Sequence, residues 1–187
     1  ESFCFDISDR SAAQCMVERV INDFGRIDIL VNCAGILEFG SITEVSSDQF
    51  ERIFDINVKG AMHISQAVLP IMKKQRHGNI VMVSAIGSQG GGGKAPVYRA
   101  SKAALNSIAE AFAEETLGTG VRVNTICPCE VKTRMSDSLG REDKDKNDWM
   151  DPEDIADIIL FFVSNQSRAV TGATLLACGK NRMSRWG

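Results

Sequence analysis

Short runs of β-branched and other apolar residues alternate along the chain with longer segments whose apolar positions recur every three or four residues. The short runs, which we predict to be strands, occupy 3–7, 27–32, 79–84, 121–126 and 174–177. The helical spacing occupies 9–24, which Gly25 ends, 47–74, 98–117, and a last segment that begins at Pro152. Repeated strand–helix–strand units predict an α/β fold, with a parallel sheet that carries helices on both faces.

No linker, internal repeat or low-complexity segment divides this pattern, and 187 residues with 44% hydrophobic content suffice for a buried core. We therefore expect a single domain over 1–187. The net charge is −3, and the lysines and arginines are spread along the chain. This distribution argues against a nucleic-acid or membrane-surface partner and favours a small molecule or a protein. Because the chain has no secretory features and no apolar run of spanning length, we expect a cytoplasmic protein.

Six cysteines lie at positions 4, 15, 33, 127, 129 and 178, a distribution that fits no two-pair zinc spacing. In a chain without secretory features we expect them to be structural thiols rather than disulfides. His63 and His77 have no second histidine or carboxylate at metal-ligand spacing. We therefore expect no metal site.

Polar or glycine-containing turns follow three of the predicted strands. They read "NCAG" (32–35), "SAIGS" (84–88) and "CPCEVKT" (127–133). The carboxyl ends of parallel strands meet at one edge of a sheet, and ligands of such sheets bind there. The three turns therefore define a candidate site.

Tyr98 and Lys102 stand four residues apart in the helical segment that follows the second turn, so they share one helix face. An ammonium near a phenol lowers the phenol pKa from about 10, which suits a tyrosine for proton exchange with a carbonyl or an alcohol. The same spacing also occurs on ordinary solvated helix faces. Taken alone, the pair leaves both interpretations open.

Five blocks of sequence, "GRIDILVNCAG", "INVKG", "NIVMVS", "YRASK" and "RVNTICPCEVKT", together resemble the short-chain dehydrogenase/reductase family. The resemblance covers nearly the whole chain, from "FDISD" to "DPEDIADIILFFVS". It implies a Rossmann-like, doubly wound parallel sheet that holds NAD or NADP. It also implies hydride transfer between the nicotinamide and a small carbonyl or alcohol substrate. The family further implies a homo-oligomer, packed through 47–74 and the tyrosine helix.

The resemblance assigns catalytic roles to three residues. Tyr98 would be the general acid/base, and Lys102 would bind the nicotinamide ribose while lowering the tyrosine pKa. Asn57 would anchor a water in a proton relay from Lys102. The alternative for Asn57 is a helix-interior asparagine that bonds to the backbone.

The resemblance also predicts the cofactor contacts, each of which has turn formation as its alternative. Asp6 and Ile7 would lie against the adenine. The ribose side and the nicotinamide carboxamide would be contacted by Asn32, Ala34 and Gly35, and by Pro128, Val131 and Thr133, respectively.

The serine that polarises the substrate carbonyl departs from the family pattern, because the usual position holds Ala85. Ser84, one place earlier, serves if the following loop absorbs a one-residue shift, and we take it as the first candidate. Ser88 is a second candidate. The third alternative is that no serine acts, which would remove a donor worth several kcal/mol, on the order of 3, in comparable sites.

The family's glycine-rich phosphate-binding turn, with its first strand–helix–strand unit, would precede Glu1, and nothing in the chain replaces it. The run "QGGGGK" (89–94) lacks a P-loop ending, and we interpret it as a flexible loop. Without the missing strands, the strand at 3–7 has no neighbour and the strand at 27–32 exposes an edge. Two explanations remain: a portion of a longer enzyme, which we favour, or a shortened member that needs a partner or is a non-catalytic scaffold.

Two cysteines also depart from the family pattern, since Cys129 replaces a common glycine and Cys33 a common second asparagine. They are either structural or a pair of redox-sensitive thiols, and low thiol pKa values would favour the second interpretation. The segment 134–148, where the family places its substrate lid, is short and charged. It does not identify the substrate.

Overall fold

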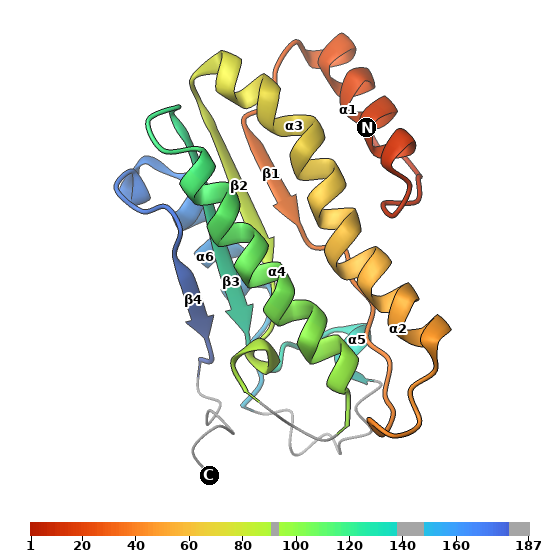
Figure 1. Ribbon diagram of the computed structural model, residues 1–187. Coiled ribbons are helices and arrows are strands. Elements are labelled where there is room, and N and C mark those ends of the chain that lie inside the picture. The colour runs from red at the N-terminus through yellow and green to blue at the C-terminus, as the bar shows by residue number, and fades with distance from the viewer. Residues whose placement is uncertain (91–93, 138–147, 180–187) are drawn as a thin grey trace.

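A computed structural model describes residues 1–90, 94–137 and 148–179. Among these residues, parallel strands form one sheet: β1 (Ile29–Asn32), β2 (Gly78–Val83), β3 (Val121–Pro128) and β4 (Thr174–Ala177). They lie side by side in chain order (Figure 1), with Cα partners that include Ile29↔Asn79, Met82↔Thr125 and Ile126↔Leu175. The α/β fold with a parallel sheet is confirmed.

The helices follow the predicted apolar spacing closely. Asp9 caps α1 (Arg10–Phe24) by accepting from Ser11 N and Ala12 N, and Gly25 ends it at φ 78°. The predicted helix over 47–74 consists of α2 (Ser47–Phe54), a π-helical turn η1 (Asp55–Gly60) and α3 (Ala61–Gln75). The remaining helical elements are η2 (Ile86–Gln89), α4 (Pro96–Glu115), α5 (Arg134–Asp137), α6 (Pro152–Val163) and η4 (Asn165–Ser167).

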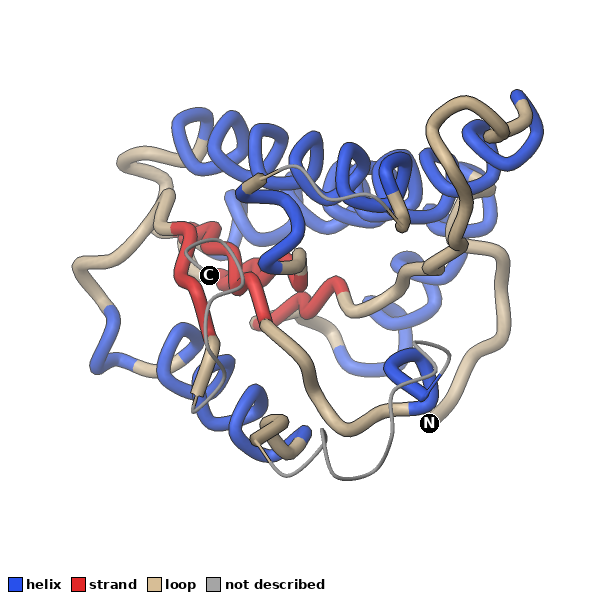
Figure 2. Tube along the Cα trace, turned by 90° about the horizontal axis from the view of Figure 1, so that it is seen from below, coloured by secondary structure: helices blue, strands red, loops and turns tan. Residues whose placement is uncertain are grey.

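Helices cover both faces of the sheet. Helices α3 and α4 pack on one face and α6 on the other, and the view along the strands shows the sheet between two helical layers (Figure 2). A first core cluster joins α1, α3 and α4 to the sheet through residues such as Val17, Met72 and Leu105. A second cluster joins α6 to the sheet through Ile126, Ile155 and Phe162. This is the doubly wound arrangement that the sequence predicts.

The strand predicted over 3–7 is wrong, because these residues form no strand. A strand needs a hydrogen-bonded neighbour, and the described sheet offers none there. Phe5 and Ile7 instead pack against the first core cluster. The strand β1 is an edge of the sheet, and its Ile29 is 46% exposed.

The six cysteines are free thiols in the structure, and Cys127 is the fully buried one. No group of three or more metal-ligating side chains occurs among the described residues. His77 Nε2 lies 3.8 Å from Asp28 Oδ1 at the surface. Across the part of the chain described, the helices are too short or too polar to cross a membrane.

Candidate active site

The loops after β1, β2 and β3 emerge at the same edge of the sheet, as the sequence predicts (Figure 1). Gly35 marks the point where the first of these loops meets η1 and α4. A Cβ atom on Gly35 would lie 3.1 Å from Asn57 Oδ1 and 3.3 Å from Lys102 Nζ. Three segments that are distant in sequence therefore converge at one glycine.

Asn57 is fully buried in the π-helical turn η1, and its side chain is hydrogen-bonded to two other segments of the chain. Its Oδ1 accepts from Ile36 N at 2.7 Å, and its Nδ2 donates to the Ile36 carbonyl oxygen at 3.0 Å. The same Nδ2 donates to Ser101 Oγ on α4, also at 3.0 Å. The alternative interpretation of Asn57 was a side chain that bonds to the backbone, and the observed bonds do so, but to a separate loop rather than to its own helix. Single π-helical turns are frequent at functional sites.

Lys102 lies on the sheet-facing side of α4 and is 4% exposed. Its Nζ donates to the Val83 carbonyl oxygen at 2.8 Å and lies 5.8 Å from the ring centroid of Tyr98. Burial lowers the pKa of Lys102 to about 8, because an ammonium loses hydration there. The lysine is therefore still mostly protonated at neutral pH, but its proton is held less tightly.

The pKa of Tyr98 is raised, whereas the sequence predicts that it is lowered. Burial, with a smaller contribution from Cys127, raises the pKa of the phenol to about 12. The lysine does not reverse this effect, because its Nζ lies over the ring and bonds to Val83. Tyr98 is therefore a protonated phenol at neutral pH and a weaker acid than a free tyrosine.

The two candidate serines have different surroundings. Ser84 is 4% exposed, and its Oγ donates to the main-chain oxygen of Lys102 at 3.0 Å, so this hydroxyl supports α4. Ser88 Oγ accepts from Asn106 Nδ2 at 2.9 Å and lies 3.7 Å from Cys127 Sγ. Because Cys127 also affects the pKa of Tyr98, Ser88 shares a polar cluster with the neighbour of the tyrosine.

The predicted adenine and ribose contacts lie on the β1 side of the site. Asp6 accepts from Ser8 N and Ser8 Oγ, and these hydrogen bonds lower the pKa of its carboxyl group. Ile7 packs over Gly60, where a Cβ would lie 2.7 Å from Ile7 Cγ2. The side chain of Asn32 points into the core and donates to Ser65 Oγ, so only its backbone faces the loop that contains Ala34 and Gly35.

The residues predicted near the nicotinamide are held mainly by backbone and packing. Pro128 is the last residue of β3 and is the Cα partner of Ala177. Val131 forms an isolated bridge with Met150, and its side chain packs against the second core cluster. Thr133 is exposed, and its Oγ1 accepts from Ser136 N at 3.3 Å.

Cys33 and Cys129 do not have the acidity expected of redox-sensitive thiols. Burial raises the pKa of Cys33, against the influence of Lys102. Burial also raises the pKa of Cys129, together with the thiol of Cys178. Cys129 is thus associated with a different cysteine from the one that the sequence suggested.

Sequence reasoning missed Ser101 and Asn106, which hold Asn57 and Ser88, respectively. Asn106 continues the four-residue spacing of Tyr98 and Lys102 along one face of α4, so helical periodicity carried a signal for it. Ser101 carried no such signal, since its role depends on η1. The central glycines of "QGGGGK" and most of the 134–148 segment lie outside the described residues.

Known proteins resemble this chain over almost its whole length. A family model described as enoyl-(acyl carrier protein) reductase matches residues 1–179. The 3-oxoacyl-(acyl-carrier-protein) reductase of Thermotoga maritima is 32% identical over 183 residues, covering 94% of this chain and 74% of the relative. Meso-2,3-butanediol dehydrogenase of Serratia marcescens is 34% identical over 177 residues, covering 91% and 70%. A solved structure of ElxO with NADP bound matches at a TM-score of 0.88 and 25% identity, covering 95% of this chain and 76% of that chain.

Proposed function

The chain belongs to the short-chain dehydrogenase/reductase family, and on this premise we propose that it is an NAD- or NADP-dependent oxidoreductase that interconverts a carbonyl and an alcohol on a small molecule. The relatives support the reaction class, since one is named as a 3-oxoacyl reductase and another as a diol dehydrogenase. The structure of ElxO with NADP bound supports the choice of cofactor. The observation that carries the proposal is the convergence of Lys102 and Asn57 at Gly35.

The residues at this convergence fit a nicotinamide nucleotide. Gly35 leaves open a space that a single Cβ would fill, next to the ammonium of Lys102. Lys102 would hold the nicotinamide ribose, and Pro128, Val131 and Thr133 would hold the ring from the β3 side. Asp6 and Ile7 would lie along the adenine. When bound, the cofactor supplies or accepts the hydride.

Tyr98 supplies the proton in the direction of carbonyl reduction. As a phenol with a pKa of about 12, it holds its proton until negative charge develops on the substrate oxygen. The proton then passes from the phenol oxygen to that oxygen, which completes the alcohol. Lys102, with a pKa of about 8 against about 12 for the phenol, is the stronger acid of the two and returns a proton to the phenolate that remains. Asn57 keeps Lys102 in place by fixing α4 through Ser101.

We assign to the Ser88 hydroxyl the role of polarising the substrate carbonyl. Ala85 has no hydroxyl, and Ser84 already donates its proton to the Lys102 main-chain oxygen. Ser88 Oγ accepts from Asn106, and its only other polar contact among the described residues is the long one of 3.7 Å to Cys127 Sγ, so a substrate oxygen can compete for its proton. The Ser88→Ala variant should lose about 10²-fold in turnover, the typical effect of removing such a donor. Ser84→Ala is the matched control, and a larger loss in the control would transfer the role to Ser84.

The exposed apolar surface of α2 bears on how the protein assembles. Phe50, which is 45% exposed, stacks on Phe54 of α2 at 4.5 Å between ring centroids, so an apolar surface is available on this helix. We assign a homo-oligomer packed through α2, α3 and α4, acting on a small molecule in the cytoplasm without nucleic acid. Light scattering coupled to size-exclusion chromatography measures the oligomer, and a monomer over the full accessible concentration range would contradict it.

Calorimetry with NADH and NADPH tests the proposed function directly. Gly35→Ala should weaken binding at least tenfold, because the new Cβ meets Asn57 and Lys102 at 3.1 and 3.3 Å. Gly40→Ala, in the same loop, is the matched control, since its Cβ would meet nothing closer than 3.7 Å. If the wild-type chain binds neither cofactor, the proposal is wrong and the non-catalytic scaffold takes its place.

A further inference from the structure

Cys129 and Cys178 occupy equivalent positions at the ends of neighbouring strands. Cys129 follows Pro128, the last residue of β3, and Cys178 follows Ala177, the last residue of β4. Pro128 and Ala177 are Cα partners, and Cys129 N donates to the Ala177 carbonyl oxygen at 2.7 Å. The parallel pairing therefore continues one residue past both strands and brings the two cysteines opposite each other.

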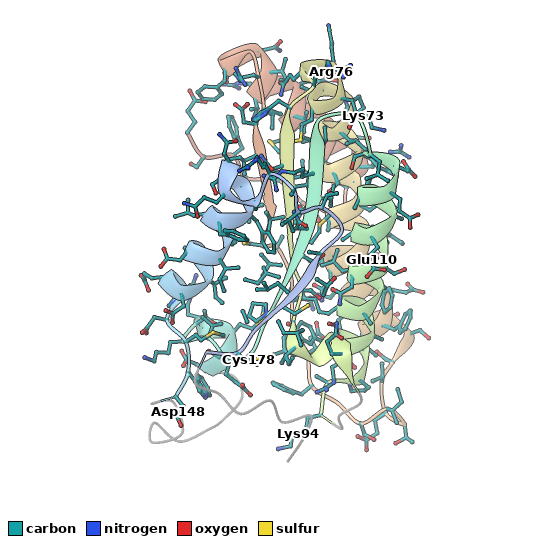
Figure 3. The ribbon with its side chains drawn as sticks, turned by 90° about the vertical axis from the view of Figure 1, so that its left-hand side faces the viewer. Lys73, Arg76, Lys94, Glu110, Asp148 and Cys178 are labelled. Carbon is teal, nitrogen blue, oxygen red and sulfur yellow. The ribbon has the colours of Figure 1, made fainter. Side chains whose placement is uncertain are left out.

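This placement suits a covalent link. Neighbouring strands lie about 4.8 Å apart. This spacing falls within the range of about 4.4 to 6.8 Å that separates the Cα atoms of a disulfide. Figure 3 labels Cys178 at the carboxyl end of β4, where the chain leaves the sheet. Both residues are half-buried rather than enclosed, so a small oxidant can reach them.

The two thiols also influence each other. The pKa of Cys129 is raised by burial first and by the Cys178 thiol second. Direct influence of this kind requires that the two sulfur atoms lie close together. The raised pKa also means that Cys129 keeps its proton and is a slow nucleophile toward an oxidant.

We propose that Cys129 and Cys178 are a modification site that a peroxide converts to a reversible disulfide. In the first step the Cys178 sulfur attacks hydrogen peroxide, which yields a sulfenic acid and one water. In the second step the Cys129 sulfur attacks the Cys178 sulfur, the S–O bond breaks, and a second water leaves. Two thiols and one peroxide thus give one disulfide and two waters, and a dithiol reductant reverses the change.

The bond would join the end of β4 to the loop after β3. This loop contains Val131 and Thr133, so a covalent link at Cys129 restrains the segment that would contact the nicotinamide. The functional consequence rests on the proposed function: oxidation lowers cofactor-dependent turnover, and reduction restores it. The disulfide itself does not depend on that function.

Peptide mass spectrometry tests the link. The chain is treated with hydrogen peroxide, free thiols are alkylated, and the protein is digested with trypsin without reduction. We expect the peptide 123–132 joined to the peptide 169–180, at the summed mass less two hydrogens plus one alkyl group on the Cys127 thiol. The first peptide also contains Cys127, so Cys127→Ser must keep the link while Cys129→Ser and Cys178→Ser lose it. Absence of the link in the wild-type chain, or its persistence in Cys129→Ser, overturns the proposal.

Turnover measured on the same samples tests the regulation. We expect the oxidised wild-type chain to lose at least threefold in turnover and a dithiol to restore it, while Cys178→Ser is unaffected by peroxide. Unchanged turnover in a chain that carries the link overturns the regulatory role and leaves the disulfide standing. A chain that forms the link but binds no cofactor contradicts the proposed function alone.

Discussion

The α4 side of the candidate site, formed by Tyr98, Lys102 and Asn57, is fastened by buried side-chain hydrogen bonds between segments far apart in the chain. The loop after β3, residues 129–133, is held by backbone hydrogen bonds and by apolar packing, as the bridge from Val131 to Met150 shows. A buried polar side chain is destabilising when its hydrogen-bond partner is removed. A hydrogen bond between backbone groups, in contrast, forms with almost any side chain at that position. Substitutions are therefore expected to be severe on the α4 side and mild in the β3 loop, where Cys129 already replaces a residue common in the family.

The largest expected effect is on the chemistry of the α4 side. Tyr98→Phe removes the proton donor and leaves the ring in place, so turnover should fall about 10³-fold or more, within the range of general acid–base catalysis. Cofactor affinity should change less than twofold, because the ring and Lys102 keep their contacts. Rates of NAD(P)H oxidation and calorimetry measure the two quantities. Retained turnover would remove Tyr98 from the mechanism.

The next effect is on stability. Asn57→Ala leaves the backbone groups of Ile36 without their partner, and each buried unsatisfied group costs about 1 to 3 kcal/mol, so the free energy of unfolding should fall by about 4 kcal/mol. Urea unfolding measures the change. Asn106→Ala is the comparison variant. It loses a hydrogen bond to the Ser88 hydroxyl, which can rotate to another partner, so its loss in the free energy of unfolding should be smaller. Equal losses would mean that the Ile36 bonds are not what fastens the loop.

The buried lysine predicts a pH dependence of stability. The pKa of Lys102 is about 8 in the folded chain, against 10.5 when unfolded, so between these values the unfolded chain binds more protons. The free energy of unfolding should therefore rise with pH across this window, by about 3 kcal/mol at most. Tyr98, raised to about 12 from 10, acts in the opposite direction above pH 10. Urea unfolding at pH 7.5, 9 and 10 should show the rise in the wild-type chain and a flatter profile in Lys102→Met.

The smallest effect is expected in the β3 loop. Thr133→Ala removes the side-chain acceptor of Ser136 N, a helix-start contact worth about 1 kcal/mol. Thr133→Ser retains that acceptor and serves as the control. Thermal unfolding of both variants measures the difference. A loss comparable with that of Asn57→Ala would mean that the two sides of the site are fastened equally strongly.

Local pattern was sufficient for most of the fold. The apolar runs predicted β1 to β4 to within a few residues, and the helical spacing over 9–24 with Gly25 at its end predicted α1, since these signals depend on adjacent residues. The run at 3–7 shows the limit of this reasoning. Its residues favour a strand, but a strand forms only where another strand lies beside it, and no local pattern contains that information.

The sequence by itself determined the parallel sheet, the edge at which the loops converge, and the shared helix face of Tyr98 and Lys102, because each follows from the period of an element or the direction of a strand. Only the tertiary structure decided that Tyr98 is a weaker acid than expected, that the Ser84 hydroxyl bonds to α4, and that Cys129 N bonds to Ala177 at the end of β4. These facts depend on burial and on contacts between segments distant in the chain. Such contacts form only when the helices and strands pack together.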